Sequence, residues 1–421
     1  MIHKTILSNG IKILTEEIPH VRSVALGIWV DLGSRYEKQN VAGISHFIEH
    51  MMFKGTPRRT AQVIAEELDA VGGQLNAFTT KEYTCYYAKT LDEHFPLAAD
   101  ILTDMIFNSR FAQEDIDRER NVILEEIKMY EDTPDELVHD LLARAVWDGH
   151  PLGHPVIGNA QVIEDLSRES LLSYYEKFYR RGHMVIAVAG NIRHEQVLEQ
   201  LAPIFETCIT DGTQSRVLVS PPPKLSQTNF QQKDTEQVHL CIGGPGLALS
   251  DERIYAMQVL NTVLGGGLSS RLFQKIREQY GLVYNVFSYH SSYHDTGIFG
   301  IYAGLSPRNA EEVLNLTLAE VKTICDQGIP EEELSRAKNQ IKGNFLLSLE
   351  GVNTRMSRLG KSELYLNQVL SPDEIVHRLE QVTSEDIKML ARVLFVKDGL
   401  CLASIGPWDD TDSWNHALTA L

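Results

Sequence analysis

The stretch Gly43-Ile44-Ser45-His46-Phe47-Ile48-Glu49-His50 combines a helical apolar pattern with two histidines and a glutamate. Apolar residues recur at positions 44, 47, 48, 51 and 52, which is the spacing of one buried helix face. On such a helix His46 and His50 lie about one turn apart on the same side. Two neutral imidazoles placed in this way can hold one zinc ion, with Glu49 beside them to act on a metal-bound water. The stretch therefore predicts a helix that carries part of a metal site.

A catalytic zinc site needs a third protein ligand and keeps one position open for water. The pattern over residues 112–130 predicts a second helix, on which Glu119, Val122, Ile123 and Glu126 share one face. Two carboxylates on a partly apolar face are costly to bury unless they are paired or metal-bound. Both Glu119 and Glu126 are therefore candidates for groups of the metal site.

The chain also contains an internal repeat, which serves as a control for this interpretation. Gln74–Phe78 resembles Val283–Phe287, and Glu114–Arg118 resembles Glu332–Arg336. The second copy lacks every candidate metal-binding group. In the order His46, Glu49, His50, Glu119 and Glu126, the opposing residues are Met257, Leu260, Asn261, Ala337 and Asn344. The fold alone does not require histidines and glutamates at these positions, so we infer that the first copy carries them for a function beyond folding.

We expect an α+β fold of two homologous domains, each a mostly antiparallel β-sheet packed with long helices. Asn9-Gly10 between alternating segments predicts a hairpin, and the alternation from Val24 to Val30 predicts a half-buried strand. Residues 74–80 and 82–90 predict two further strands. Three consecutive prolines, Pro221–Pro223, cannot continue a helix or a central strand and mark a linker. The expected boundaries are 1–212 for the domain with the metal motif, 213–228 for the linker and 229–421 for the second domain.

Composition limits the functions that this chain can have. The formal net charge of −18 argues against nucleic-acid binding, which needs basic patches to neutralise phosphates. The 5 cysteines are scattered and never form a C-x-x-C pair, which indicates a reducing compartment and a metal site without thiolates. The first residues already read as a strand and a turn, and no stretch is long enough to span a bilayer. We therefore expect a cytoplasmic protein that binds neither nucleic acid nor membrane.

The motifs resemble the pitrilysin–insulinase family of zinc peptidases, in which the metal motif has the inverted order H-x-x-E-H. The resemblance is closest to the half-length branch, which includes bacterial processing proteases and the beta subunit of the mitochondrial processing peptidase. It implies a half-clamshell chain with a Zn²⁺ cofactor, held by His46, His50 and Glu126. It also implies that Glu49 is the general base and that Glu119 orients a ligand histidine. The segments that carry it are Gly43–His46, Phe53–Thr56, Gly72–Phe78, Arg120–Glu126 and Ser270–Tyr284.

The same resemblance implies substrate-binding residues in both halves of the chain. Asn76 and Ala77 would lie on an edge strand to which a peptide adds, although the residues alone equally fit an ordinary core hairpin. Arg277 and Tyr284 would contact the substrate backbone and help to stabilise the tetrahedral oxyanion. In the family these two come from the half that faces the zinc. A chain of this length holds one half, so we expect a homodimer, or a heterodimer with a metal-free paralogue.

These expectations define a zinc-dependent endopeptidase that hydrolyses peptides or unfolded protein segments enclosed in a dimeric chamber. Two alternatives remain open at the level of sequence. One is a noncatalytic structural or substrate-binding subunit of a processing-peptidase-like complex, although such subunits characteristically have degraded metal motifs. The other is a metallohydrolase that acts on non-peptide substrates.

Overall fold

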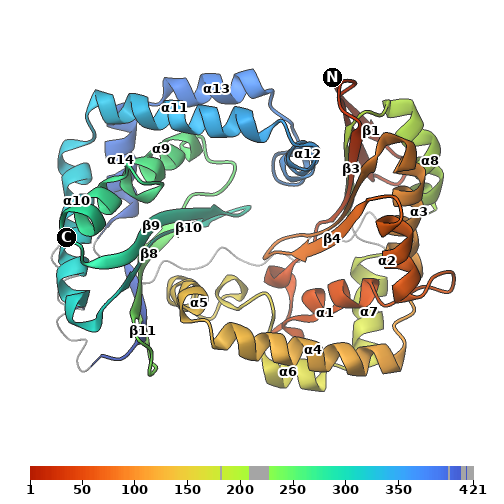
Figure 1. The fold of residues 1–421 in the computed structure, drawn as a ribbon, viewed down its shortest axis with the longest axis horizontal. Helices are drawn as coiled ribbons and strands as arrows, with labels where there is room; N and C mark the ends of the chain where they lie inside the picture. Colours follow the sequence, from red (N-terminus) through yellow and green to blue (C-terminus); the bar gives the residue numbers. More distant parts are fainter. Residues whose placement is uncertain (181–182, 208–226, 397–398, 409–413, 415–421) are drawn as a thin grey trace. The chain divides into compact units, whose positions relative to one another are not determined.

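The computed structural model describes residues 1–180, 183–207, 227–396, 399–408 and 414. The predicted linker, 213–228, falls outside the described residues except for its last two positions. The chain divides into two compact units, and each unit is built on one β-sheet (Figure 1). No helix within the described ranges has both the length and the apolar composition needed to cross a membrane.

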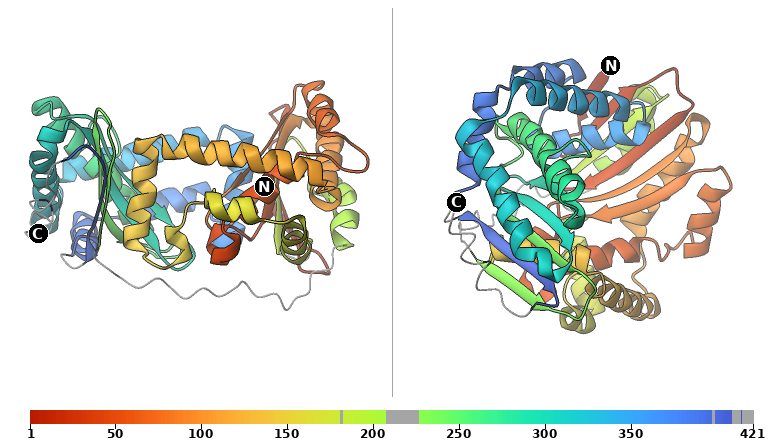
Figure 2. Two further views of the ribbon diagram at one scale, coloured as in Figure 1. Left: turned by 90° about the horizontal axis from the view of Figure 1, so that it is seen from below. Right: turned by 60° about the vertical axis from the view of Figure 1, so that its left-hand side comes forward.

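The first unit contains a six-stranded sheet in the order β1-β2-β6-β3-β5-β4. Only β2 and β6 are parallel; the other neighbouring pairs are antiparallel. The predicted hairpin at Asn9-Gly10 is confirmed, since Gly10 has a φ of 87° between β1 and β2. β4 is the last strand of the sheet, and among the described strands it pairs only with β5. Strands β1 to β5, red to orange, can also be followed in the right-hand view of Figure 2. The strands are β1 (Ile2–Ile6), β2 (Lys12–Glu17), β3 (Ser23–Val30), β4 (Gln74–Thr79), β5 (Thr84–Leu91) and β6 (Met184–Gly190).

Helices from the first half of the sequence cover one face of this sheet. The predicted apolar side of α1 is fully buried there, with Phe47 and Ile48 at 0% exposure. It packs with residues of β3 such as Ile28 into one continuous core. The helices are α1 (Ile44–Met52), α2 (Ala61–Asp69), α3 (Phe95–Asn108), α4 (Gln113–Glu131), α6 (Ala160–Asp165), α7 (Arg168–Phe178) and α8 (His194–Glu206).

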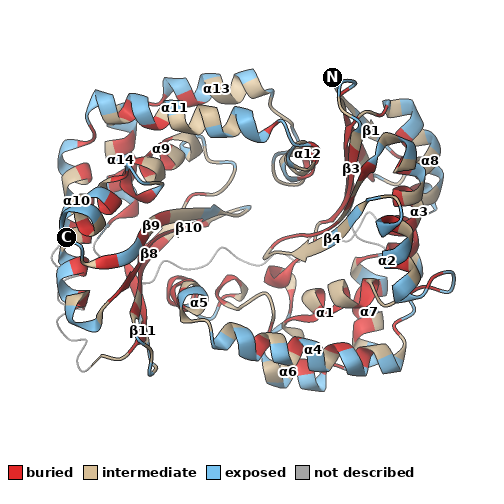
Figure 3. Ribbon diagram, in the orientation of Figure 1, coloured by how far each residue is buried: buried red, intermediate tan, exposed pale blue. Residues whose placement is uncertain are grey.

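The other face of the first sheet is covered by α12 (Val352–Leu366), which comes from the second half of the sequence. Trp29 of β3 packs with Met356 of α12 on this face, while Val24 and Leu26 face the opposite core. The helix approaches closely, because a Cβ added at Gly360 would lie 2.3 Å from Cε2 of Trp29. β3 is therefore buried on both faces (Figure 3), and the prediction of a half-buried strand was wrong.

The second unit repeats this design with a five-stranded sheet in the order β7-β11-β8-β10-β9. β7 and β11 are parallel and the other pairs are antiparallel, as in the series β2-β6-β3-β5-β4 of the first unit. The internal repeat and the mostly antiparallel α+β architecture are thereby confirmed. The strands are β7 (Thr228–Gln232), β8 (Val238–Gly246), β9 (Val283–Ser292), β10 (Gly297–Leu305) and β11 (Cys401–Gly406), and the helices are α9 (Ile254–Gly265), α10 (Ala310–Gln327), α11 (Glu331–Ser348), α13 (Pro372–Gln381) and α14 (Ser384–Leu394).

The two halves of the sequence exchange one helix each. α5 (Pro134–Val146) packs on β8 and β11 of the second unit, in the position that α12 takes in the first. The compact units therefore differ from the predicted sequence domains 1–212 and 229–421. Met129–Gly153 belongs to the second unit and Ser348–Val369 to the first. The physical reason is that the central strands are apolar on both faces, so each sheet needs a second helical cover.

Candidate metal centre

The two histidines of the motif project from the same side of α1. Their ring centroids are 4.7 Å apart and the ring planes make an angle of 64°. Both side chains are mostly shielded, with 14% of His46 and 21% of His50 exposed. Burial, with a smaller effect of the neighbouring His50, lowers the pKa of His46 to about 4. His46 is therefore neutral near pH 7, which is the form that binds metal.

Glu126 of α4 brings a carboxylate to these two rings. α4 is the long orange helix in the left view of Figure 2. Nε2 of His46 lies 4.0 Å from Oε1 of Glu126, and Nε2 of His50 lies 3.6 Å from Oε2. One ligand atom from each residue lies within 4.8 Å of the other two. Ligands about 2.1 Å from one zinc ion in a tetrahedral site are about 3.4 Å apart. The three residues therefore fit a zinc ion after a small contraction.

Glu119 holds the ring of His50 from the side opposite Glu126. Its Oε2 lies 3.1 Å from Nδ1 of His50, and its Oε1 lies 2.7 Å from Nζ of Lys54. Glu119 is 4% exposed, so Lys54 supplies the charge partner that a buried carboxylate needs. A carboxylate on the second ring nitrogen fixes the orientation of a metal-binding histidine. Lys54 could not be predicted from the sequence, because it lies beyond the end of α1, where helical spacing no longer indicates the direction of a side chain.

Glu49 sits on the same helix between the two histidines. Burial raises its pKa, and a hydrogen bond from Thr79 acts in the opposite direction. The Thr79 hydroxyl donates this bond to Oε2 of Glu49 over 2.5 Å. Glu49 is also close enough to His50 and Glu126 for both charges to influence it. Thr79 was not among the predicted site residues; its one sequence signal is its place at the end of β4.

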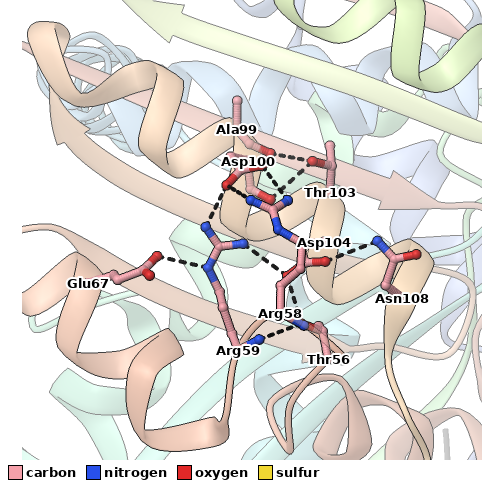
Figure 4. A network of polar contacts seen from close by, with 9 residues as sticks. All are labelled: Thr56, Arg58, Arg59, Glu67, Ala99, Asp100, Thr103, Asp104 and Asn108. Carbon is pink, nitrogen blue, oxygen red and sulfur yellow. Dashed lines mark hydrogen bonds and ion pairs between the residues drawn. The ribbon is translucent and has the colours of Figure 1, made fainter.

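The segment that follows α1 is fixed by a dense polar network (Figure 4). The Arg59 guanidinium bonds to Glu67 of α2 and to Asp100 and Asp104 of α3, at 2.8, 2.5 and 2.9 Å. Thr56 donates to Asp104 over 2.7 Å and accepts the backbone N–H of Arg59. Ion pairs with Arg58 and Arg59 hold the pKa of Asp100 below its usual range. This network holds the segment after α1 against α2 and α3.

The predicted substrate residues lie in both units. Asn76 and Ala77 are on β4, the edge strand, where the Asn76 side chain accepts the N–H of Ala77 over 2.8 Å. Arg277 lies in a π-helix, Phe273–Gln279, with its guanidinium 4.7 Å from the Phe273 ring and 6.0 Å from the Tyr284 ring. Tyr284 is 75% exposed on β9, which is the edge strand of the second sheet. The two residues therefore form one contiguous pair within the second unit.

Comparison with known proteins places the chain in a family. Residues 12–160 match the family model "Insulinase (Peptidase family M16)", and residues 165–341 match "Peptidase M16 inactive domain". An uncharacterized zinc protease of Bacillus subtilis, YmxG, is 45% identical over 97% of this chain and 98% of its own length. One of Streptomyces coelicolor is 41% identical over 97% of this chain and 90% of its own. The crystal structure of a protease from Helicobacter pylori has the same fold, with a TM-score of 0.92 at 20% identity over 97% of this chain and 99% of that one. The chain therefore belongs to the insulinase family of peptidases, M16.

Proposed function

We propose that this protein is a zinc-dependent endopeptidase that hydrolyses peptides or unfolded protein segments. The observation that carries the proposal is the convergence of His46, His50 and Glu126 around one point, with the Glu49 carboxyl on the same helix. The names of the relatives support a metallopeptidase. The ligand set of two imidazoles and one carboxylate is one that catalytic zinc sites use, with a further position open to water.

Each residue of the centre has a proposed role in hydrolysis. His46, His50 and Glu126 hold the metal, and Glu119 keeps the His50 ring in its binding orientation. A zinc ion bound there supplies a polarised water and a polarised scissile carbonyl. Glu49 takes a proton from the attacking water and later donates it to the leaving amine nitrogen. Thr79 binds one oxygen of Glu49 and leaves the other to carry the proton.

The substrate is proposed to bind as an extended strand. β4 is the edge strand of the sheet in the part of the chain that the structure describes. Its main chain at Asn76 and Ala77 can pair with a peptide backbone once the Asn76 side chain releases the Ala77 N–H. Arg277 and Tyr284 offer a guanidinium and a phenol hydroxyl, both donors suited to a peptide carbonyl or to the oxyanion. We propose that a second copy of the chain supplies this pair to each metal centre, in a homodimer that encloses the peptide.

Metal analysis and a peptide assay test this function together. The purified protein should contain close to one zinc per chain by elemental analysis. It should cleave an unstructured peptide at internal bonds, lose that activity in a chelator and regain it when zinc is restored. Stoichiometric zinc without cleavage of peptides would refute the peptidase assignment. A protein without zinc would instead support the noncatalytic alternative.

A further inference from the structure

A buried carboxylate outside the metal centre holds the first turn of the motif helix. Glu37, which is 7% exposed, accepts the backbone N–H of Gly43 at Oε2 over 2.6 Å and that of Ser45 at Oε1 over 2.8 Å. Gly43 is the N-cap of α1 and has no side chain with which to cap it. A carboxylate at a helix N-terminus satisfies free N–H groups and interacts favourably with the helix dipole. Glu37 therefore acts as a cap supplied from outside the helix.

The backbone at this end of α1 also packs closely against the backbone of Ile157 and Gly158. Gly43 has a φ of 95°, and a Cβ added there would lie 2.7 Å from the carbonyl oxygen of Ile157 and 2.9 Å from the Cα of Gly158. The hydroxyl of Ser45 lies 3.4 Å from that of Tyr174 on α7. His46 is the next residue after Ser45, so the direction in which its ring projects depends on this first turn.

The chain segment that carries Glu37 is itself tied to the β4–β5 turn. The N–H of Ser34 donates to the carbonyl of Thr80 over 3.1 Å, and that of Arg35 donates to Lys81 over 2.7 Å. The Arg35 guanidinium also pairs with Glu82 over 2.7 Å, and both side chains are 3% exposed. The segment that carries Glu37 is therefore anchored to the β4–β5 turn.

We propose that Glu37 is a positioning residue of the metal centre, which fixes the first turn of α1 so that His46 and His50 meet Glu126. A buried carboxylate costs stability, and an apolar side chain would fill the same space without that cost. The carboxylate instead supplies one acceptor oxygen for the N–H of Gly43 and one for the N–H of Ser45. The inference rests on the proposed zinc site, but it concerns metal affinity and not peptide hydrolysis.

The test measures metal binding by Glu37→Gln and Glu37→Asp at pH 8 and 25 °C. Gln turns an amide NH₂ toward one of the two N–H donors, and Asp is one methylene too short to reach both. We expect the zinc affinity of folded Glu37→Gln, measured by chelator competition, to fall by about 10-fold or more. The visible absorption spectrum of the cobalt-substituted protein should also change, because it reports the geometry around the metal. Glu37→Asp should show a smaller loss of zinc affinity. It replaces Glu37→Gln in the test if that variant does not fold.

Glu16→Gln is the matched control. Glu16 is also 7% exposed in the same unit, but it pairs with Arg355 of α12 over 2.5 Å on the far face of the sheet. This variant should lose thermal stability and keep the wild-type zinc affinity and cobalt spectrum. The inference is overturned if Glu37→Gln, or Glu37→Asp in its place, matches the wild type in both readouts. It is also overturned if Glu16→Gln weakens zinc binding equally. Wild-type protein that binds no zinc would overturn the inference and the proposed function together, whereas zinc binding without hydrolysis would overturn only the function.

Discussion

The Thr79 hydroxyl at the end of β4 donates a hydrogen bond to the Glu49 carboxyl on α1. This bond joins the strand to which we expect a peptide to add and the group that we propose as general base. The two residues are 30 positions apart in sequence, and the packing of α1 against β4 brings them together. A peptide that pairs with β4 would therefore lie beside the base that acts on it.

Replacing Thr79 by Val should slow hydrolysis and shift its pH dependence. The bond favours the ionised form of Glu49, so its loss raises the pKa of Glu49 further. The acidic limb of the kcat/KM profile should then move to higher pH, and kcat should fall by about 10-fold, because the bond to a charged group is lost. Thr79→Ser retains the hydroxyl and should restore the wild-type profile. An unchanged acidic limb in Thr79→Val would show that this bond does not tune the base.

Replacing Glu49 by Gln tests the role of the general base without removing a metal ligand. Gln has nearly the same shape but cannot accept the proton of the attacking water, so hydrolysis should fall by about 10²-fold to 10⁴-fold. Zinc content should remain that of the wild type, because Glu49 is not one of the three proposed ligands. His50→Ala should lose both zinc and activity. Glu49→Gln protein that cleaves peptides at the wild-type rate would refute the assignment of the base.

Much of this architecture could be predicted from the sequence. The spacing of apolar residues identified α1 and its buried face. The comparison of the two repeats pointed to Glu126 and Glu119, and the structure places both beside the histidines of α1. The partners Thr79, Lys54 and Glu37 were not predicted, because each reaches its target through a tertiary contact that local spacing does not encode. The exchange of α5 and α12 was missed for a related reason. An apolar strand face shows that a cover exists but not which segment provides it.

The ionisation of Glu37 should make the stability of the metal-free protein depend on pH. Burial raises its pKa from 4.5 to about 7, against opposing hydrogen bonds from Gly43 and Ser45 and the charge of Lys81; Tyr174 faces the same carboxyl. The folded state then binds the proton more tightly than the unfolded state. The stabilisation from this group is fully present below pH 4.5 and is lost as the pH rises through about 7.

Glu37→Gln removes this titration and provides the measurement. Between pH 4.5 and 7 the wild type should lose about 3 kcal/mol of unfolding free energy relative to the variant, since each pKa unit corresponds to about 1.4 kcal/mol. Urea unfolding in the presence of a chelator, at several pH values, gives the difference directly. A difference that stays constant over this range would show that Glu37 has an ordinary pKa.

The contact between α12 and β3 predicts that one added methyl group at Gly360 lowers the stability of the protein. Gly360→Ala would place a Cβ against the Trp29 ring and should destabilise the protein by about 1 to 3 kcal/mol through overpacking. Gly343→Ala is the control, because Gly343 lies inside α11 with open space around its Cβ position. It should stabilise the protein by up to about 1 kcal/mol through helix propensity. Equal urea midpoints for the two variants would contradict the close packing of α12.

The proposed homodimer can be tested by mixing two inactive variants. Glu49→Gln lacks the base, and Arg277→Ala lacks part of the pair on the second unit. If each metal centre uses the Arg277 of the other copy, a mixed dimer has one centre with both groups intact and one with neither. Random exchange of subunits should then restore about a quarter of the wild-type activity, because half of the dimers are mixed and each has one working centre. If each chain completes its own centre, or if the partner is a different protein, mixing restores nothing beyond the sum of the separate variants. Size-exclusion chromatography of the wild type, with light scattering, shows whether the chains pair at the concentration of the assay.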